Sequence, residues 1–168
     1  RDPFVAVTRA AHPFAKLEEV PLIAFADETL ISNDQQRSIG HRIVVSACVA
    51  AGFTPRFAIQ AEDFYTAIAF VEEGLGVAIM PRMAAQMASL ISSSNIQMRP
   101  IKGPEPSRTL IALMRVTGPP NRAADRALQV LVEMTRAEEA ASSQAEQAEL
   151  AGTAYAEAAR ATNADANA

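Results

Sequence analysis

Apolar and polar positions follow two different periods along the first 135 residues of the chain. Short apolar runs predict strands, and segments with an apolar residue every three or four positions predict helices. The predicted strands are residues 4–7, 21–25, 56–60, 76–80, 96–101 and 109–116, with a short extended piece at 29–31. The predicted helices are residues 36–51, 64–73, 82–90 and 122–135. Because the two types alternate, we expect an α/β fold with a mainly parallel sheet.

Composition changes sharply near Arg136. Alanine makes up 14 of the last 33 residues, and bulky apolar side chains are almost absent there. Alanine and glutamate favour helix, but such a segment offers little apolar surface for packing. We therefore expect residues 138–168 to form a frayed helix that passes into disorder.

Charge and cysteine content narrow the function classes. The net charge of −4 resides in the tail, so the remaining residues sum to about zero and present no basic patch for phosphates. This chain should therefore not bind DNA by itself.

The one cysteine, Cys48, cannot form an internal disulfide and is expected to be buried, which fits a reducing cytoplasm. No apolar run approaches the roughly 18 residues of a membrane span, so we expect no membrane contact.

Residues 50–84 hold the most informative motif. Gly52-Phe53-Thr54-Pro55 is followed by Glu62-Asp63, a helix, and then Val71-Glu72-Glu73-Gly74-Leu75-Gly76-Val77-Ala78-Ile79-Met80-Pro81. This order resembles the regulatory domain of LysR-type transcriptional regulators. Upstream, His12-Pro13-Phe14-Ala15 resembles the HPLA segment of that family. The resemblance covers about residues 3–137.

The resemblance implies a type II periplasmic-binding-protein-like domain with two lobes and a small-molecule effector in the cleft between them. Residues 1–16 would be a crossing strand and remnant of the first lobe, 17–114 the second lobe, and 115–137 the return to the first lobe with a C-terminal helix. The tail at 138–168 lies outside the family pattern. The winged helix-turn-helix domain and most of the first lobe have no counterpart in this chain. We therefore interpret it as an N-terminally truncated regulator that contacts DNA only through the absent domain.

Family members pair through their sensor domains, so a homodimer or homotetramer of the full-length protein is expected. The apolar stripe of the helix at 36–51 is a candidate contact surface. Packing of that stripe on the chain's own sheet remains an equal alternative.

The lobes that the resemblance implies give a zone of candidate effector-binding residues. Thr8 and Arg9 lie beside the implied crossing strand, and Phe25, Ala26 and Asp27 follow the first strand of the second lobe. Gln60, Ala61, Glu62, Asp63 and Phe64 form a strand-to-helix loop at the carboxyl end of a strand, where open α/β sheets bind ligands. Backbone N–H groups at the start of the helix from Phe64 could hold a carboxylate. Glu62 and Asp63 disfavour a strongly anionic ligand there, unless Arg9 or another cation offsets them. Simple helix capping by these two acids stays open.

Other chemistry finds little support. His12 and His41 lie far apart without neighbouring metal-binding residues, so we expect no metal. Gly74-Leu75-Gly76 lacks the third glycine of a dinucleotide site, and no serine nucleophile motif is present. We therefore expect no catalytic residues, no cofactor and no enzymatic activity. The alternatives left open are a transport solute-binding protein of the same fold and an enzyme on that scaffold using Glu62 or Asp63.

Overall fold

The computed structural model describes residues 1–32, 38–90, 95–115, 117, 121–137 and 140. The chain divides into two compact units, Arg1–Ile111 and Ala112–Ala168, which are described separately. None of the helices in the described ranges is long and apolar enough to cross a membrane.

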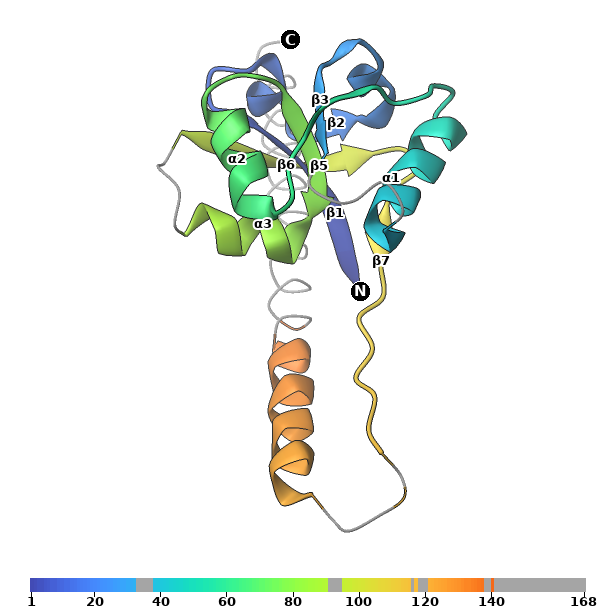
Figure 1. The fold of residues 1–168 in the computed structure, drawn as a ribbon, viewed down its shortest axis with the longest axis vertical. Helices are drawn as coiled ribbons and strands as arrows, with labels where there is room; N and C mark the ends of the chain where they lie inside the picture. Colours follow the sequence, from blue (N-terminus) through green and yellow to red (C-terminus); the bar gives the residue numbers. More distant parts are fainter. Residues whose placement is uncertain (33–37, 91–94, 116, 118–120, 138–139, 141–168) are drawn as a thin grey trace, which may run out of the picture. The chain divides into compact units, whose positions relative to one another are not determined.

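Seven strands in the described part of the first unit form one sheet with the order β2-β6-β1-β5-β3-β4, and β7 pairs with β1 (Figure 1). They are β1 (Asp2–Arg9), β2 (Val20–Pro21), β3 (Leu30–Ser32), β4 (Phe57–Gln60), β5 (Val77–Pro81), β6 (Ile96–Lys102) and β7 (Ser107–Arg108). The central strand β1 runs antiparallel to β5, β6 and β7. β3 runs parallel to β4 and β5, and β2 parallel to β6. The α/β class is confirmed, but the sheet is mixed rather than mainly parallel.

All four predicted helices are present. The first unit contains α1 (Ile39–Ala50), α2 (Phe64–Glu72) and α3 (Arg82–Ser89), and residues 122–137 of the second unit are helical. Two of these helices begin at a capping side chain: Ser38 caps α1 by accepting the His41 N–H at 3.0 Å, and Asn121 accepts the Ala124 N–H at 3.1 Å. Such side chains satisfy N–H groups that a helix cannot pair internally. The expected start of the first helix at Gln36 lies outside the described residues.

Two predicted strands are wrong. Residues 22–27 form a 3₁₀ helix, η2 (Leu22–Asp27), which follows the two-residue strand β2. Residues 109–115 are neither helix nor strand, and Ile111 and Leu113 are 74% and 91% exposed. Pairing of this segment stops at Arg108, opposite Asp2. Beyond that point no strand of the described chain lies alongside to accept the hydrogen bonds that an apolar run needs to become a strand.

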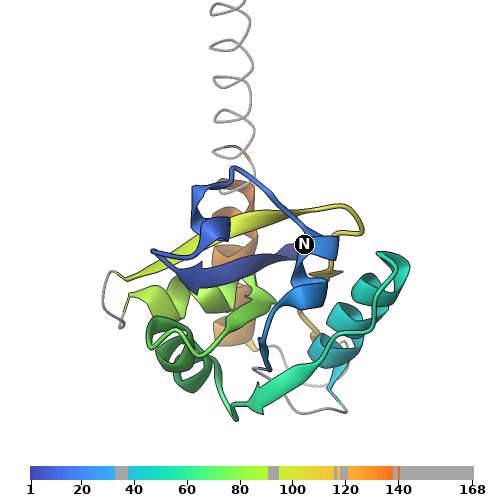
Figure 2. The same cartoon turned by 90° about the horizontal axis from the view of Figure 1, so that it is seen from above.

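Apolar side chains cover both faces of the sheet, because successive residues of a strand point to opposite faces. On β1, Phe4 and Ala6 join one core cluster with Val44 and Cys48 of α1. Val5 and Val7 join a second cluster with residues of α2 and α3. Helix α1 therefore packs on one face, and α2 and α3 pack on the other (Figure 2). Ile43 and Ala47 of the predicted stripe pack in part against the core around Val44 and Cys48, while Ile39 of the stripe and Val49 outside it stay exposed.

Candidate functional site

A cavity of about 370 Å³ lies where the parallel strands end at their carboxyl termini. The first turns of α1 and α2 and the last residue of β5 contribute to it, together with the start of β1 and the chain at β7. Its lining residues are Phe4, Ile39, Gly40, Ile43, Phe64, Pro81, Arg108 and Thr109. This volume falls at the small end of the range of ligand sites in proteins. The carboxyl edge of parallel strands is also the place where such folds bind ligands.

The loop from Gln60 to Phe64 connects β4 to α2 at this edge. Ala61 is buried, and its N–H donates to the Ser32 carbonyl at 2.9 Å, which ties the loop to the end of β3. Gln60 and Glu62 are exposed, and Phe64 is half-buried and lines the cavity. Of the candidate residues predicted from the sequence, Phe64 alone lines this cavity, and the other loop residues precede it at the same edge of the sheet.

Asp63 is the N-cap of α2. Its Oδ1 accepts the Thr66 N–H at 2.8 Å, and its Oδ2 accepts the Thr66 hydroxyl at 3.0 Å. These donors stabilise the charged form, so the pKa of Asp63 lies below its ordinary value. The capping interpretation is therefore confirmed for Asp63. The Thr66 N–H at the start of α2 is already taken, which leaves less room for a ligand carboxylate at this helix end.

The other candidate residues lie at the opposite edge of the sheet. Because β1 is antiparallel to β5, with Phe4 opposite Pro81 and Val7 opposite Ala78, Thr8 and Arg9 lie near the start of β5. Thr8 is buried, and among the described residues its hydroxyl has no hydrogen-bond partner. The guanidinium of Arg9 packs near Gly74: a Cβ built there would lie 3.0 Å from Arg9 Nη1. The structure therefore separates these two residues from the loop at Glu62.

Phe25, Ala26 and Asp27 also belong to that opposite edge. They end η2, just before the start of β3, and the Phe25 ring is buried among core residues. Phe25 packs edge-on against Phe14 with ring centroids 5.1 Å apart. The strand in this part of the chain is β3, which follows these residues and ends at Ser32. Phe25, Ala26 and Asp27 therefore precede the strand instead of following one.

Arg108 lines the cavity, and no sequence pattern points to it. Its Nε lies 2.8 Å from Asp2 Oδ2, and the Asp2 side chain is 1% exposed. The other oxygen of Asp2 accepts the Met83 N–H at 3.1 Å, in the first turn of α3. Asp2 and Arg108 are 106 positions apart, so no local motif could indicate their contact. Phe4, Ile39 and Pro81 of the cavity wall come together for the same long-range reason.

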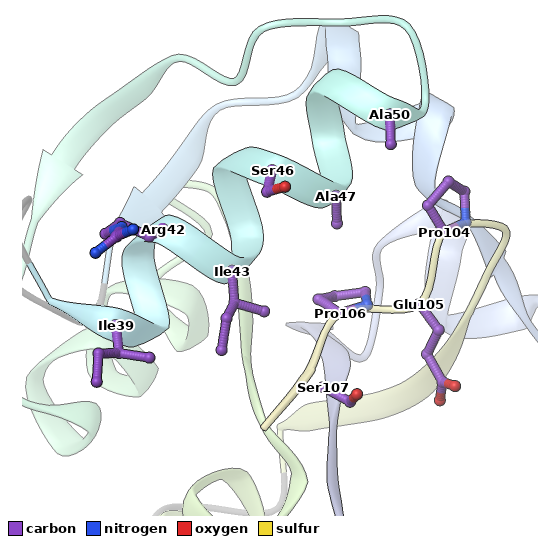
Figure 3. Close-up of a pocket in the computed structure, with 10 residues that line it drawn as sticks. All are labelled: Ile39, Arg42, Ile43, Ser46, Ala47, Ala50, Pro104, Glu105, Pro106 and Ser107. Carbon is purple, nitrogen blue, oxygen red and sulfur yellow. The ribbon is translucent and has the colours of Figure 1, made fainter. Parts of the chain in front are cut away.

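A second, larger cavity of about 610 Å³ lies between α1 and the loop at 104–107. Figure 3 shows Ile43, Ala47 and Ala50 of α1 turned toward Pro104 and Pro106 of that loop, with Arg42 on the far side of the helix. Its lining combines apolar residues and prolines with Arg42, Glu105 and two serines. The smaller cavity lies at the carboxyl ends of the parallel strands, where such folds bind ligands, so we regard it as the candidate site despite its volume.

Metal and thiol chemistry gain no support in the described residues. No group of three His, Cys, Asp or Glu side chains there could hold a metal ion. His12 contacts Glu28 at 3.5 Å, and its Nδ1 accepts the Phe14 N–H. Burial raises the pKa of the Cys48 thiol to about 11, so it stays protonated and unreactive at neutral pH.

Comparison with known proteins agrees with this architecture. Three solved structures share the fold: the Synechocystis PCC6803 CcmR regulatory domain in complex with 2-PG (19% identity, TM-score 0.50), an OxyR mutant of Corynebacterium glutamicum (25%, 0.52), and the effector binding domain of QuiR in complex with shikimate (22%, 0.52). Each alignment covers 60% of this chain and 47%, 31% and 46% of the respective structure. The chain thus spans less than half of these relatives. No curated protein matches it.

The family model described as the LysR substrate binding domain matches residues 1–136. That range includes the whole first unit, with the strand ends and the cavity described above, and the helix at 122–136. The chain belongs to the LysR substrate-binding domain family.

Proposed function

We propose that this chain senses a small-molecule effector in the cavity lined by Phe64 and Arg108, as the regulatory part of a LysR-type transcriptional regulator. The observation that carries the proposal is the cavity itself, which lies at the carboxyl ends of β3, β4 and β5 and is walled by the starts of two helices. Similar regulatory domains are seen with bound 2-PG and with bound shikimate. Of the sequence candidates, Gln60, Ala61, Glu62, Asp63 and Phe64 stay in the proposed site.

The wider role follows from the family and is also a proposal. Effector binding would alter how paired sensor domains hold DNA through a separate winged helix-turn-helix domain, so the protein would act in the cytoplasm. No catalytic step is needed for this role. The proposed divisions between the two lobes are at residues 16 and 114, and the proposed division between the first lobe and the tail is at residue 137.

Helix α1 is the proposed pairing surface. Ile39 and Val49 are 75% and 59% exposed, while the opposite side of the helix packs on the sheet. Replacing Val49 with Asp should weaken homodimers of the full-length regulator, as measured by light scattering coupled to size-exclusion chromatography. Unchanged dimerisation in that variant would rule out this surface.

A thermal-shift screen of small carboxylates, alcohols and aromatic compounds on the 168-residue chain tests effector binding. A ligand at 100 times its Kd should add about 2.7 kcal/mol to the free energy of unfolding. Phe64→Ala should abolish that shift, because Phe64 lines the cavity. Tyr65→Ala is the matched control, since Tyr65 is exposed on the same helix turn and does not line it. A ligand that responds to neither change, or to both equally, would contradict the proposed site.

A further inference from the structure

A short segment after β7, residues 110–114, presents only apolar side chains and is exposed along its whole length. Leu110, Ile111, Leu113 and Met114 are 54%, 74%, 91% and 38% exposed. Single apolar residues on a surface are normal, but an unbroken exposed run of them marks an interaction surface. We call residues 110–114 the apolar segment.

The backbone of the apolar segment is also unpaired. The chain enters it from β7, which is already extended and paired with β1 at Asp2 and Pro3. Among the described residues, no hydrogen bond reaches a backbone N–H or carbonyl group of the apolar segment. A row of free donors and acceptors on an extended chain is a template to which another strand can add. Because β7 already holds the preceding residues in place, little further ordering is needed before such a strand binds.

The composition of the apolar segment suits pairing with a copy of itself. It has no charge, glycine or proline, and such segments pair readily with identical segments of other chains. In a strand, Leu110, Ala112 and Met114 would face one side, and Ile111 and Leu113 would face the other. Both faces would therefore offer apolar contacts to a second copy.

Charged residues at the two ends decide the direction of such pairing. In a parallel ribbon in register, Arg108 would lie opposite Arg108 and Arg115 opposite Arg115, and like charges in that position are destabilising. In an antiparallel ribbon centred on Ala112, Arg115 lies opposite Thr109 instead. The charges therefore favour the antiparallel arrangement.

The same antiparallel register matches the apolar side chains. Ile111 of one copy lies opposite Leu113 of the other, and Leu110 lies opposite Met114. Each of these pairs occurs twice, because the two copies are related by a two-fold axis at Ala112. The apolar segment is thus its own complement.

We propose that the apolar segment forms an antiparallel β-ribbon with the same segment of a second copy of this chain. The contact is closed, because both copies use the same residues, so it joins two chains and no more. The ribbon is much smaller than a standard protein interface, so the dimer should dissociate in the micromolar range. Among the described residues, none after Thr109 lines the proposed effector cavity, so this surface is distinct from it.

Two double variants test the ribbon and its direction. Ile111→Lys with Leu113→Lys places like charges opposite each other in the antiparallel register, whereas Ile111→Lys with Leu113→Glu places opposite charges there. Both variants change the same two exposed side chains, so the loss of apolar contact is matched. Sedimentation equilibrium of the 168-residue chain should give the first variant a dimer Kd about tenfold higher than that of the second. The natural chain should have the lowest Kd of the three.

Cysteine cross-linking locates the two-fold axis. Residues directly opposite in an antiparallel pair have Cα atoms about 4.5–5.5 Å apart, within reach of a disulfide. Mild oxidation should therefore link two Ala112→Cys chains, as seen on a non-reducing gel. Leu110→Cys is the matched control, because its two copies would lie about 13 Å apart along the ribbon. Cys48 is buried, so the natural chain should stay unlinked.

Several results would overturn the inference. A natural chain that is monomeric at millimolar concentration, or that forms open-ended assemblies, would exclude a closed ribbon. Equal Kd values for the two double variants, or equal cross-linking of Leu110→Cys and Ala112→Cys, would exclude the antiparallel register. A dimer that Val49→Asp abolishes and both double variants leave unchanged would assign association to α1. Effector binding at Phe64 has its own test and does not depend on these outcomes.

Discussion

The two edges of the same parallel strands differ in how their space is filled. At the amino edge, a Cβ built on Gly76 would lie 2.4 Å from the Thr29 carbonyl oxygen, and Phe25 is 1% exposed. At the carboxyl edge, Phe64 and Arg108 border a cavity. The comparison shows that strand direction decides which of two chemically similar loops borders open space. Phe25 and Phe64 are the same residue type, yet Phe25 supports the core and Phe64 lines the cavity.

The largest expected effect contrasts these two phenylalanines. Phe25→Ala should lower the free energy of unfolding by about 3–5 kcal/mol, because it leaves a void in a closed core beside Phe14. Phe64→Ala should lower it by only about 1 kcal/mol, because its ring is half-buried at the cavity. Urea denaturation followed by circular dichroism measures both values. Equal losses would remove the distinction between the two edges.

Gly76→Ala should lower the free energy of unfolding by about 3 kcal/mol, because the new methyl group must displace the Thr29 carbonyl. That carbonyl accepts the Val77 N–H at 2.9 Å, so the pairing of β5 is disturbed as well. Gly52→Ala is the control: Gly52 has φ of +93° but no neighbour within 4 Å of an added Cβ. Gly52→Ala should lower the free energy of unfolding by only about 1–2 kcal/mol, the cost of placing a residue with a Cβ at a positive φ. A Gly76→Ala chain as stable as the Gly52→Ala chain would argue against close packing at the amino edge.

Cys48 makes stability depend on alkaline pH. Its pKa is raised from 9.0 to about 11 by burial, so the folded state keeps a proton that the unfolded state loses. The resulting stabilisation is fully present below pH 9 and is lost as pH rises through about 11, for a total of about 2–3 kcal/mol. Denaturation at pH 8 and pH 10.5 should show a larger loss for the natural chain than for Cys48→Ala. Parallel behaviour of the two chains would mean that Cys48 ionises as freely as in the unfolded state.

The smallest expected effect concerns Asp63 at the carboxyl edge. Asp63→Ala should lower the Tm by about 2–4 °C, because the Thr66 N–H loses its acceptor. The pKa of Asp63 is lowered in the folded state, so its contribution is present above pH 3.8 and is lost as pH falls through the lower folded value. Asp63→Asn should retain most of the cap, and differential scanning calorimetry can compare the three proteins. A similar Tm for all three would remove the capping role.

Local patterns predicted most elements of the fold, because periodicity and the glycine and proline signals act over a few residues. Helices α1 and α2 end just before Gly52 and Gly74, the two glycines that predicted their ends. Strand β5 ends at Pro81, the residue that predicted the start of the next helix. The two wrong strands depend on distant partners. Residues 22–27 turn into a 3₁₀ helix before β3, and residues 109–115 have no strand beside them in the described chain. Apolar content alone does not distinguish these outcomes.

Only those parts of the candidate site that depend on neighbouring residues in the sequence could be predicted. The loop at Gln60–Phe64 follows its strand directly, so sequence order was enough to place it. Thr8 and Arg9 lie at the other edge of the sheet because β1 runs antiparallel to β5, a pairing that nothing in the sequence shows. Arg108 depends on a contact with Asp2 across 106 positions, which no periodic pattern can show.

The position of β1 in the middle of the sheet also sets an order of events during synthesis. Its residues leave the ribosome before those of its neighbours β5, β6 and β7, which begin at Val77, Ile96 and Ser107. The nascent chain must therefore hold an unpaired apolar strand until β5, the first of these neighbours, has emerged. Contacts of such long range slow folding and expose the intermediate to aggregation. Deleting the first nine residues would split the sheet between β6 and β5 and not merely shorten one end.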